Sequence, residues 1–168
     1  KLVVAALNGH AVGGGLELAL ACDLRIARKG VQLSMPDVAM GTMPTFGGTQ
    51  RLTRVLGKTR ALQFLLEGDT LDAEQAFHLG LVARVMDEPD VDQFRAKVHE
   101  ILQRFVPPAK APLAVGRIKA AIHAASELPL EEGSCLEREL QAALLTTHDA
   151  AEGLQASMGK RNPRFQGR

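Results

Sequence analysis

The chain opens with an unbroken run of small and branched apolar residues, which predicts a buried strand. The predicted strand covers residues 1–7, of which all but Lys1 are apolar, and Asn8 and Gly9 then supply a turn. No turn, cap or methionine precedes the run. Because a domain seldom begins inside a strand, we interpret the chain as part of a longer protein, although a processed terminus would look the same.

A glycine loop, a short apolar helix and two short strands follow. Gly13, Gly14 and Gly15 precede residues 16–22, a segment so apolar that we expect its helix to be buried on all sides. Residues 24–27 and 31–34 then predict strands, which Pro36 ends. This alternation of strands and helices is typical of an α/β fold.

A second glycine-rich segment, residues 41–48, predicts a loop rather than a helix or strand. We expect a helix from residue 49 to Gly57, with Gly57 in the left-handed conformation that often ends helices. Another helix should cover residues 60–66 and end at Gly68.

Asp72 and Gln75 have the spacing of a capping box, in which each side chain accepts from the backbone amide of the other residue. They predict a helix that begins at this point and ends at Gly80. Residues 81–85 then predict a strand.

Beyond this strand the pattern changes to long amphipathic helices. We expect four of them, over residues 91–105, 112–125, 130–145 and 150–158. The chain therefore divides into residues 1–90, which we expect to carry the chemistry, and residues 91–168, a helical extension for packing and oligomerisation.

In the third of these segments, residues 130–145, the sequence pattern predicts one apolar stripe along the helix. The stripe consists of leucines at every fourth position, namely Leu136, Leu140 and Leu144. The charged residues between them can face water; they are Glu131, Arg138 and Glu139.

Composition narrows the possible functions only slightly. The 168 residues, 46% of them hydrophobic, suffice for the core of one domain, and a net charge of +1 gives no field that would attract nucleic acid. Cys22 and Cys135 favour buried, reduced thiols and hence a cytoplasmic location, or the mitochondrial matrix in a eukaryote. We expect no membrane span, because no apolar run approaches ~18 residues.

The three glycines suggest a binding site for an oxygen that becomes negative. Glycine lets a ligand approach the backbone closely, and the amides at a helix N-terminus point outward with partial positive charge. A dinucleotide fingerprint fails, because Leu18 stands where a third glycine or alanine is needed. A simple tight turn over Gly13, Gly14 and Gly15 remains the alternative.

Two acids are candidates for proton transfer. Glu17 is the only charged residue between Leu16 and Cys22, and desolvation on such an apolar helix would suit a proton donor or acceptor. Alternatively, it only complements the helix dipole. Asp37 follows Pro36 and precedes the second glycine loop, so the two acids could hold a water between them. Asp37 could equally be a turn residue.

Other chemistry has less support. The five histidines lack metal-ligand spacing, and no serine lies in a nucleophile elbow. Four basic side chains follow the second glycine loop: Arg51, Arg54, Lys58 and Arg60. The simplest interpretation is a solvated helix face, although some of these side chains could contact a coenzyme A phosphate.

Along essentially its whole length, the chain resembles the enoyl-CoA hydratase/isomerase family, also called crotonases. The resemblance is carried by residues 8–23 (NGHAVGGGLELALACD), 36–52 (PDVAMGTMPTFGGTQRL), 57–58, 73–82 (AEQAFHLGLV) and 152–165. It implies a crotonase-like spiral of ββα turns, C-terminal helices that build homotrimers or hexamers, and acyl-CoA thioester substrates. No separate cofactor is implied, since coenzyme A is part of the substrate.

The resemblance also assigns residues to roles. Gly14 would donate its amide to the thioester oxygen, and Glu17 would be one of two acid/base carboxylates. We expect the other carboxylate to be Asp37. Substrate contacts are expected from both glycine loops, at Gly13, Gly15, Pro44, Phe46 and Gly47.

Three departures from the family pattern leave the reaction open. Asp37 stands where the hydratases have a glutamate, one methylene longer. Ser157 and Gly159 replace the usual Phe and Glu, next to Lys160 and Arg161, where coenzyme contacts from a neighbouring subunit often lie. The family's N-terminal half, with its second oxyanion donor, lies upstream of this sequence, so we expect the chain alone to be inactive.

The leading hypothesis is therefore an enoyl-CoA hydratase. An isomerase or another enolate-forming lyase is the first alternative, and a non-catalytic acyl-CoA-binding relative is the second.

Overall fold

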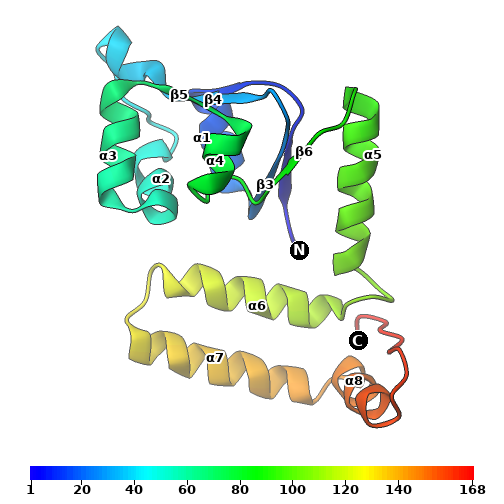
Figure 1. Ribbon diagram of the computed structural model, residues 1–168. Helices are drawn as coiled ribbons and strands as arrows, with labels where there is room; N and C mark the ends of the chain where they lie inside the picture. The colour runs from blue at the N-terminus through cyan, green and yellow to red at the C-terminus, as the bar shows by residue number, and fades with distance from the viewer. The chain divides into compact units, whose positions relative to one another are not determined.

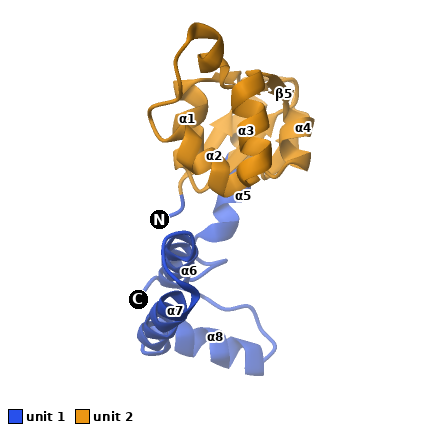
Figure 2. Ribbon diagram, turned by 90° about the vertical axis from the view of Figure 1, so that its left-hand side faces the viewer, with its two compact units in different colours: residues 1–2, 99–168 blue, residues 3–98 orange.

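The computed structural model describes residues 1–168 and consists of two compact units. Val3–Val98 form one unit, and Lys1–Leu2 with His99–Arg168 form the other (Figure 2). Helix α5, Val91–Leu102, begins in the first unit and ends in the second. No helix is long and apolar enough to cross a membrane.

The first unit contains two three-stranded sheets (Figure 1). One is entirely parallel, with the order β1 (Val4–Leu7), β3 (Leu24–Arg28) and β6 (Arg84–Met86). The other has the order β2 (Ala11–Val12), β4 (Gln32–Ser34) and β5 (Thr70–Asp72), with β2 parallel and β5 antiparallel to β4. The first four strands thus alternate between the sheets, whereas β4 and β5 belong to the same sheet; α1, Gly14–Ala21, follows β1 and β2.

Strand β6 begins three residues later than the sequence predicts. The amides of Leu81 and Val82 both donate to the carbonyl of Ala76, at 2.8 and 3.2 Å, so these two residues complete the turn after α4. They are buried without joining the sheet. Pairing with β3 begins only at Ala83, whose amide donates to the Arg25 carbonyl at 2.8 Å.

The remaining helices of the first unit are short. They are η1, a 3-10 helix (Pro36–Met40), and the α-helices α2 (Gly48–Leu56), α3 (Lys58–Glu67) and α4 (Ala73–His78). The capping box of α4 is present: the Gln75 amide donates to Asp72 Oδ1 at 2.7 Å, and the Asp72 amide to Gln75 Oε1 at 2.9 Å.

Two glycines end helices in different ways. Gly68 ends α3 in the left-handed conformation. Gly57 has φ 77° and ψ 163°, so its predicted left-handed helical cap is wrong. The reason is that α3 begins at the next residue, and Gly57 must reverse the chain between α2 and α3.

The expectation that α1 is buried on all sides is also wrong. Leu16, Ala19 and Leu20 join a core with Leu33 and Leu52, whereas Leu18 is 71% exposed. Only one face of the helix packs against this core, and Leu18 points away from that face.

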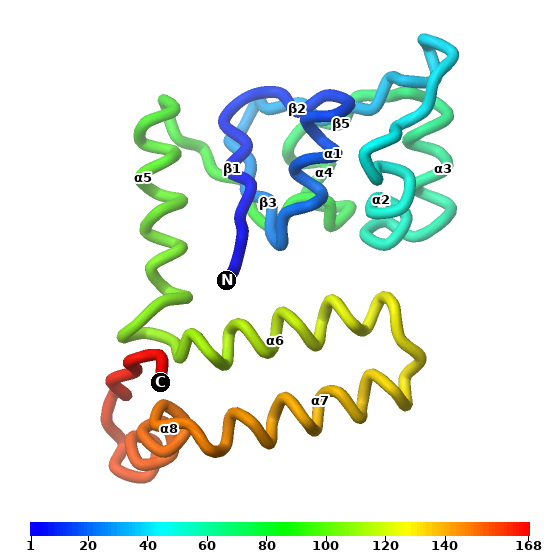
Figure 3. Tube along the Cα trace, turned by 180° about the vertical axis from the view of Figure 1, so that it is seen from behind, coloured from blue at the N-terminus to red at the C-terminus, as the bar shows by residue number.

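The second unit is helical, with α6 (Pro112–Ala125) and α7 (Leu130–Leu145) side by side and antiparallel (Figures 1 and 3). Their bounds match the prediction. The leucine stripe of α7 is partly buried, and Glu131, Arg138 and Glu139 are exposed as expected. Before α6, Gln103–Phe105 form a second 3-10 helix, η2.

Helix α8, His148–Met158, begins two residues before the predicted start, because Thr147 caps it by accepting from the Ala150 amide at 3.1 Å.

Two acids of α8 hold the C-terminal tail. Asp149 is buried, and its two carboxylate oxygens accept from the amides of Gln166 and Gly167, both at 2.8 Å. Glu152 pairs with Arg161 at 2.6 and 2.8 Å and accepts from the Arg164 amide. The hydrogen bonds from Arg161, which have the largest effect, and from the Arg164 amide lower the pKa of Glu152 to about 2.

Candidate active site

The first glycine loop leaves two backbone amides without an acceptor. Gly13 has φ 51°, a conformation that favours glycine, and its amide donates to the Ser34 carbonyl of β4 at 2.9 Å. Its carbonyl accepts from Leu16 and Glu17, at 2.9 and 3.0 Å. The amides of Gly14 and Gly15 donate to no acceptor within the chain. They lie at the N-terminus of α1, where they can bind an anionic oxygen.

The second glycine loop meets the first at Phe46. A Cβ on Gly14 would lie 3.9 Å from Phe46 Cδ2, so the ring lies directly beside the Gly14 backbone. The ring itself is largely exposed. A group bound by the Gly14 amide would therefore lie next to this ring.

Glu17 joins the two loops from the buried side. Only 2% of the residue is exposed, and its Oε1 accepts from the amides of Phe46 and Gly48, at 2.8 and 2.7 Å. Both amides lie at the N-terminus of α2, where a negative charge is stabilised. Oε2 makes no hydrogen bond within the chain, so one oxygen anchors the side chain and the other remains available.

The fit around Glu17 depends on Gly48. A Cβ at this position would lie 2.8 Å from both Glu17 Oε1 and Pro44 Cβ, distances that real Cβ atoms do not show. Pro44 is buried, and Gly47 has φ 92°. Gly48 therefore has no room for a side chain between Glu17 and Pro44.

Asp37 is not hydrogen-bonded to Glu17 or to the two amides that anchor it. Its carbonyl accepts from the backbone amide and the hydroxyl of Thr42, both at 3.1 Å, which closes the turn after η1. Its side-chain Oδ2 is buried without a hydrogen-bond partner. No hydrogen bond joins Asp37 to Glu17, and the role of Asp37 as the second carboxylate stays a prediction.

Two arginines, one beside the second glycine loop and one at the C-terminal end of α1, make contacts that the sequence did not indicate. Arg51, interpreted as part of a solvated face, is partly buried and donates to the Phe46 carbonyl at 2.7 Å. Arg25 donates to the carbonyls of Leu81, Cys22 and Ala19, at 2.6, 3.0 and 3.3 Å, and so holds the C-terminal end of α1. Burial lowers the pKa of Arg25.

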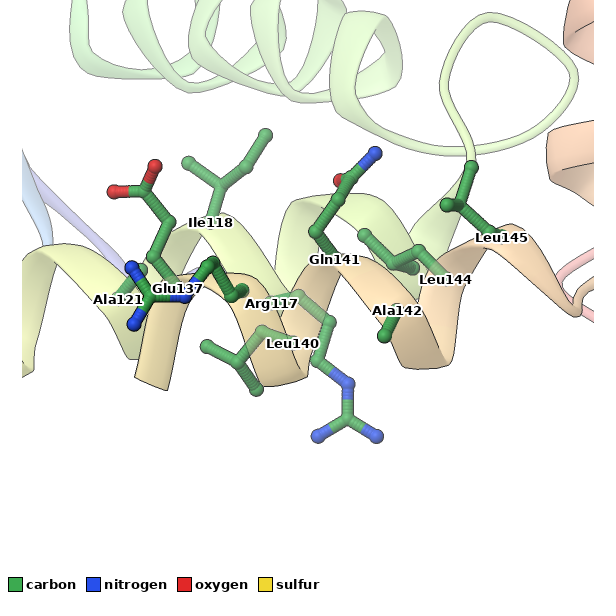
Figure 4. Close-up of a pocket in the computed structure, with 10 residues that line it drawn as sticks. Arg117, Ile118, Ala121, Glu137, Leu140, Gln141, Ala142, Leu144 and Leu145 are labelled. Atoms are coloured by element: carbon green, nitrogen blue, oxygen red, sulfur yellow. The ribbon is translucent and has the colours of Figure 1, made fainter. Parts of the chain in front are cut away.

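No group of three His, Cys, Asp or Glu side chains is arranged to hold a metal ion. The helical unit has two open hollows of about 380 and 340 Å³, and neither is lined by a predicted site residue. The larger one lies along α6 and α7 (Figure 4). Its lining includes Ile118, Leu140, Leu144 and Leu145 together with a few charged residues.

Comparison with known proteins places the chain in a family. The family model described as enoyl-CoA hydratase/isomerase matches residues 1–168. A probable mitochondrial enoyl-CoA hydratase from Dictyostelium discoideum is 38% identical over 97% of this chain and 57% of its own length. The 2,3-dehydroadipyl-CoA hydratase of Escherichia coli (strain K12) is 37% identical over 100% of this chain and 64% of its own length.

Solved structures agree with the sequence comparison. An enoyl-CoA hydratase from Bacillus anthracis superposes with a TM-score of 0.91 at 36% identity, covering 100% of this chain and 63% of that one. The predicted crotonase-like α/β fold is thereby confirmed. The chain spans less than two thirds of the length of these relatives.

Proposed function

Because the chain belongs to the enoyl-CoA hydratase/isomerase family, we propose that the full-length protein is an enoyl-CoA hydratase that adds water across the 2,3 double bond. One observation carries this proposal. The first turn of α1 holds both the Gly14 amide, which has no acceptor within the chain, and Glu17, whose carboxylate is anchored through one oxygen. One can stabilise a developing oxyanion, and the other can move a proton. Relatives that carry hydratase names support the reaction type.

In the proposed mechanism, the Gly14 amide donates to the thioester oxygen of the substrate. Water forms a bond to C3, the C2=C3 π electrons move into the thioester, and the resulting enolate oxygen is held by this amide. Glu17 Oε2 and Asp37 handle the protons: one takes a proton from water and the other delivers one to C2. Gly13, Gly15, Pro44, Phe46 and Gly47 line the substrate position. No metal or separate cofactor takes part, since coenzyme A enters with the substrate.

The amide itself can be tested, because Gly14 is the first residue of α1. Proline is tolerated at this helix position and has no N–H. We expect Gly14→Pro to lower kcat for crotonyl-CoA hydration by about 10²–10³, the usual cost of losing one oxyanion donor. Gly14→Ala keeps the amide and is the matched control. Equal activity in both variants, close to wild type, would remove Gly14 from the mechanism.

An isomerase is the second candidate, and Asp37 favours it. The shorter side chain lacks a hydrogen-bonded link to Glu17, and one carboxylate is sufficient to shuttle a proton between carbons. The substrate that distinguishes the two reactions is a 3-enoyl-CoA. Conversion to the 2-enoyl product without hydration would favour the isomerase, whereas hydration of crotonyl-CoA would favour the hydratase.

The exposed apolar face of α6 and α7 supports assembly into a homotrimer or hexamer. Ile118, Ile122 and Leu145 are each more than half exposed, an arrangement typical of a surface that another protein covers. Light scattering on the full-length protein should give a multiple of the subunit mass, and Ile118→Asp with Ile122→Asp should reduce it. A monomer at all concentrations would contradict the assembly. We place the enzyme in the cytoplasm, or in the mitochondrial matrix of a eukaryote.

A further inference from the structure

The backbone of Phe46 is held from two sides. Its amide donates to Glu17 Oε1 at 2.8 Å, and its carbonyl accepts from Arg51 Nη1 at 2.7 Å. The Gly48 amide adds a second bond to the same carboxylate oxygen at 2.7 Å. The loop that anchors Glu17 is thus itself fixed by Arg51.

Gly47 is shaped to receive this arginine. A Cβ on Gly47 would lie 2.5 Å from Arg51 Nη1 and 2.9 Å from its Cζ, so the guanidinium lies directly against the glycine backbone. The Arg51 amide also donates to the Gly47 carbonyl at 2.9 Å, as part of the first turn of α2. Arginine and loop therefore fit together as one unit.

Arg51 has no other side-chain partner that would explain its position. It forms no ion pair within the chain, and its one side-chain hydrogen bond is to Phe46. Arg54 provides a contrast on the same helix: it is exposed and donates to the carbonyl of Gln50, one turn earlier, at 3.1 Å. Arg54 thus bonds to its own helix, whereas Arg51 bonds to the loop.

We propose that Arg51 is a positioning residue for the proton transfer carried out by Glu17. By fixing the Phe46 carbonyl, it keeps the amides of Phe46 and Gly48 directed at Oε1, which in turn holds Oε2 in place for the reacting water. This inference rests on the proposed function, since it assigns Glu17 a role in catalysis. A displacement near 1 Å at a catalytic group costs ~10²-fold in rate, so a small movement of this loop is sufficient for a large effect.

The kinetic test uses the full-length protein and crotonyl-CoA. We expect Arg51→Gln to lower kcat by about 10²-fold, while KM changes by less than about threefold because substrate binding is retained. Arg51→Lys should recover part of the loss, since lysine can still donate to the Phe46 carbonyl. The matched control is Arg54→Gln, which removes a side chain that bonds only to its own helix; its kcat should equal that of wild type, and any loss of coenzyme A binding would appear in KM alone. In a Glu17→Gln background, Arg51→Gln should cost less than about threefold, because residues that act through one another are not additive.

Equal losses from Arg51→Gln in both backgrounds would overturn the proposal, since Arg51 would then act independently of Glu17. Hydrogen exchange supplies a readout that does not depend on activity. Arg51→Gln should speed exchange of the Phe46 and Gly48 amides, and Arg54→Gln should not. If the wild-type protein fails to hydrate crotonyl-CoA, the proposed function fails. Unchanged exchange at these two amides contradicts the role of Arg51 itself.

Discussion

Two buried carboxylates, one in each compact unit, illustrate how similar surroundings can serve different purposes. Glu17 and Asp149 are each 2% exposed, lie near a helix N-terminus and accept two backbone amides from a distant segment. Glu17 receives both amides on one oxygen, whereas Asp149 receives one on each. The difference therefore concerns how many oxygens remain available rather than how deeply the group is buried.

This difference separates a carboxylate suited to chemistry from one that only maintains the fold. Both oxygens of Asp149 are satisfied by the tail, so a change of protonation would break a structural bond. Glu17 Oε2 makes no hydrogen bond within the chain, and it can exchange a proton while Oε1 keeps its anchors. Replacing each acid by the corresponding amide, Glu17→Gln and Asp149→Asn, tests this interpretation.

Glu17→Gln should have the largest effect, and on activity rather than stability. The glutamine carbonyl can still accept from Phe46 and Gly48, but the side chain can no longer take up a proton. We expect kcat for crotonyl-CoA hydration to fall by about 10²–10⁴, with a melting temperature close to wild type. Unchanged turnover would remove Glu17 from the mechanism. A large loss of stability would mean that its second oxygen also has a structural role.

Asp149→Asn should show the reverse pattern. One oxygen becomes an NH₂ group that must face the amide of Gln166 or Gly167, which leaves buried donors opposed. We expect the free energy of unfolding to fall by about 1–3 kcal/mol, measured by urea denaturation, with kcat per folded molecule unchanged. Loss of activity without loss of stability would contradict the distinction between the two acids.

The smallest effect is expected at the partly exposed ion pair between Glu152 and Arg161, and it depends on pH. The folded-state pKa of Glu152 is about 2, below its ordinary value of 4.5, so the unfolded state binds more protons between these values. The contribution of Glu152 to stability is complete above pH 4.5 and is lost as the pH falls toward 2. Stability of wild type should therefore fall more steeply over this window than that of Glu152→Gln. Parallel curves would show that the pair contributes nothing measurable.

How much of the fold the sequence predicts depends on the length of each pattern. The helices over Pro112–Ala125 and Leu130–Leu145 were predicted with their observed bounds, because several turns of apolar periodicity define them. Strand β2, with only Ala11 and Val12, has no period to detect and was missed. The same holds for β5, Thr70–Asp72, which pairs with a strand distant in sequence.

The candidate site divides in a similar way. Glu17 was identifiable as the one charge on an apolar helix, and Gly14 through its place among consecutive glycines. Their partners were not identifiable, because the groups that hold Glu17 are backbone amides, which every residue except proline carries. Arg51 resembled any exposed helix cation in the sequence, and only the folded loop brings the Phe46 carbonyl to it.

The tight fit of Gly48 against Glu17 also limits how these two positions can change over generations. A methyl group at residue 48 would overlap the carboxylate at residue 17, 2.8 Å away, so a lineage that keeps Glu17 cannot accept alanine there. A shorter residue at position 17 removes only part of this overlap, because the methyl group would still lie 2.8 Å from Pro44 Cβ. A non-glycine residue at 48 would therefore mark a descendant in which both residue 17 and the loop around Pro44 had already changed.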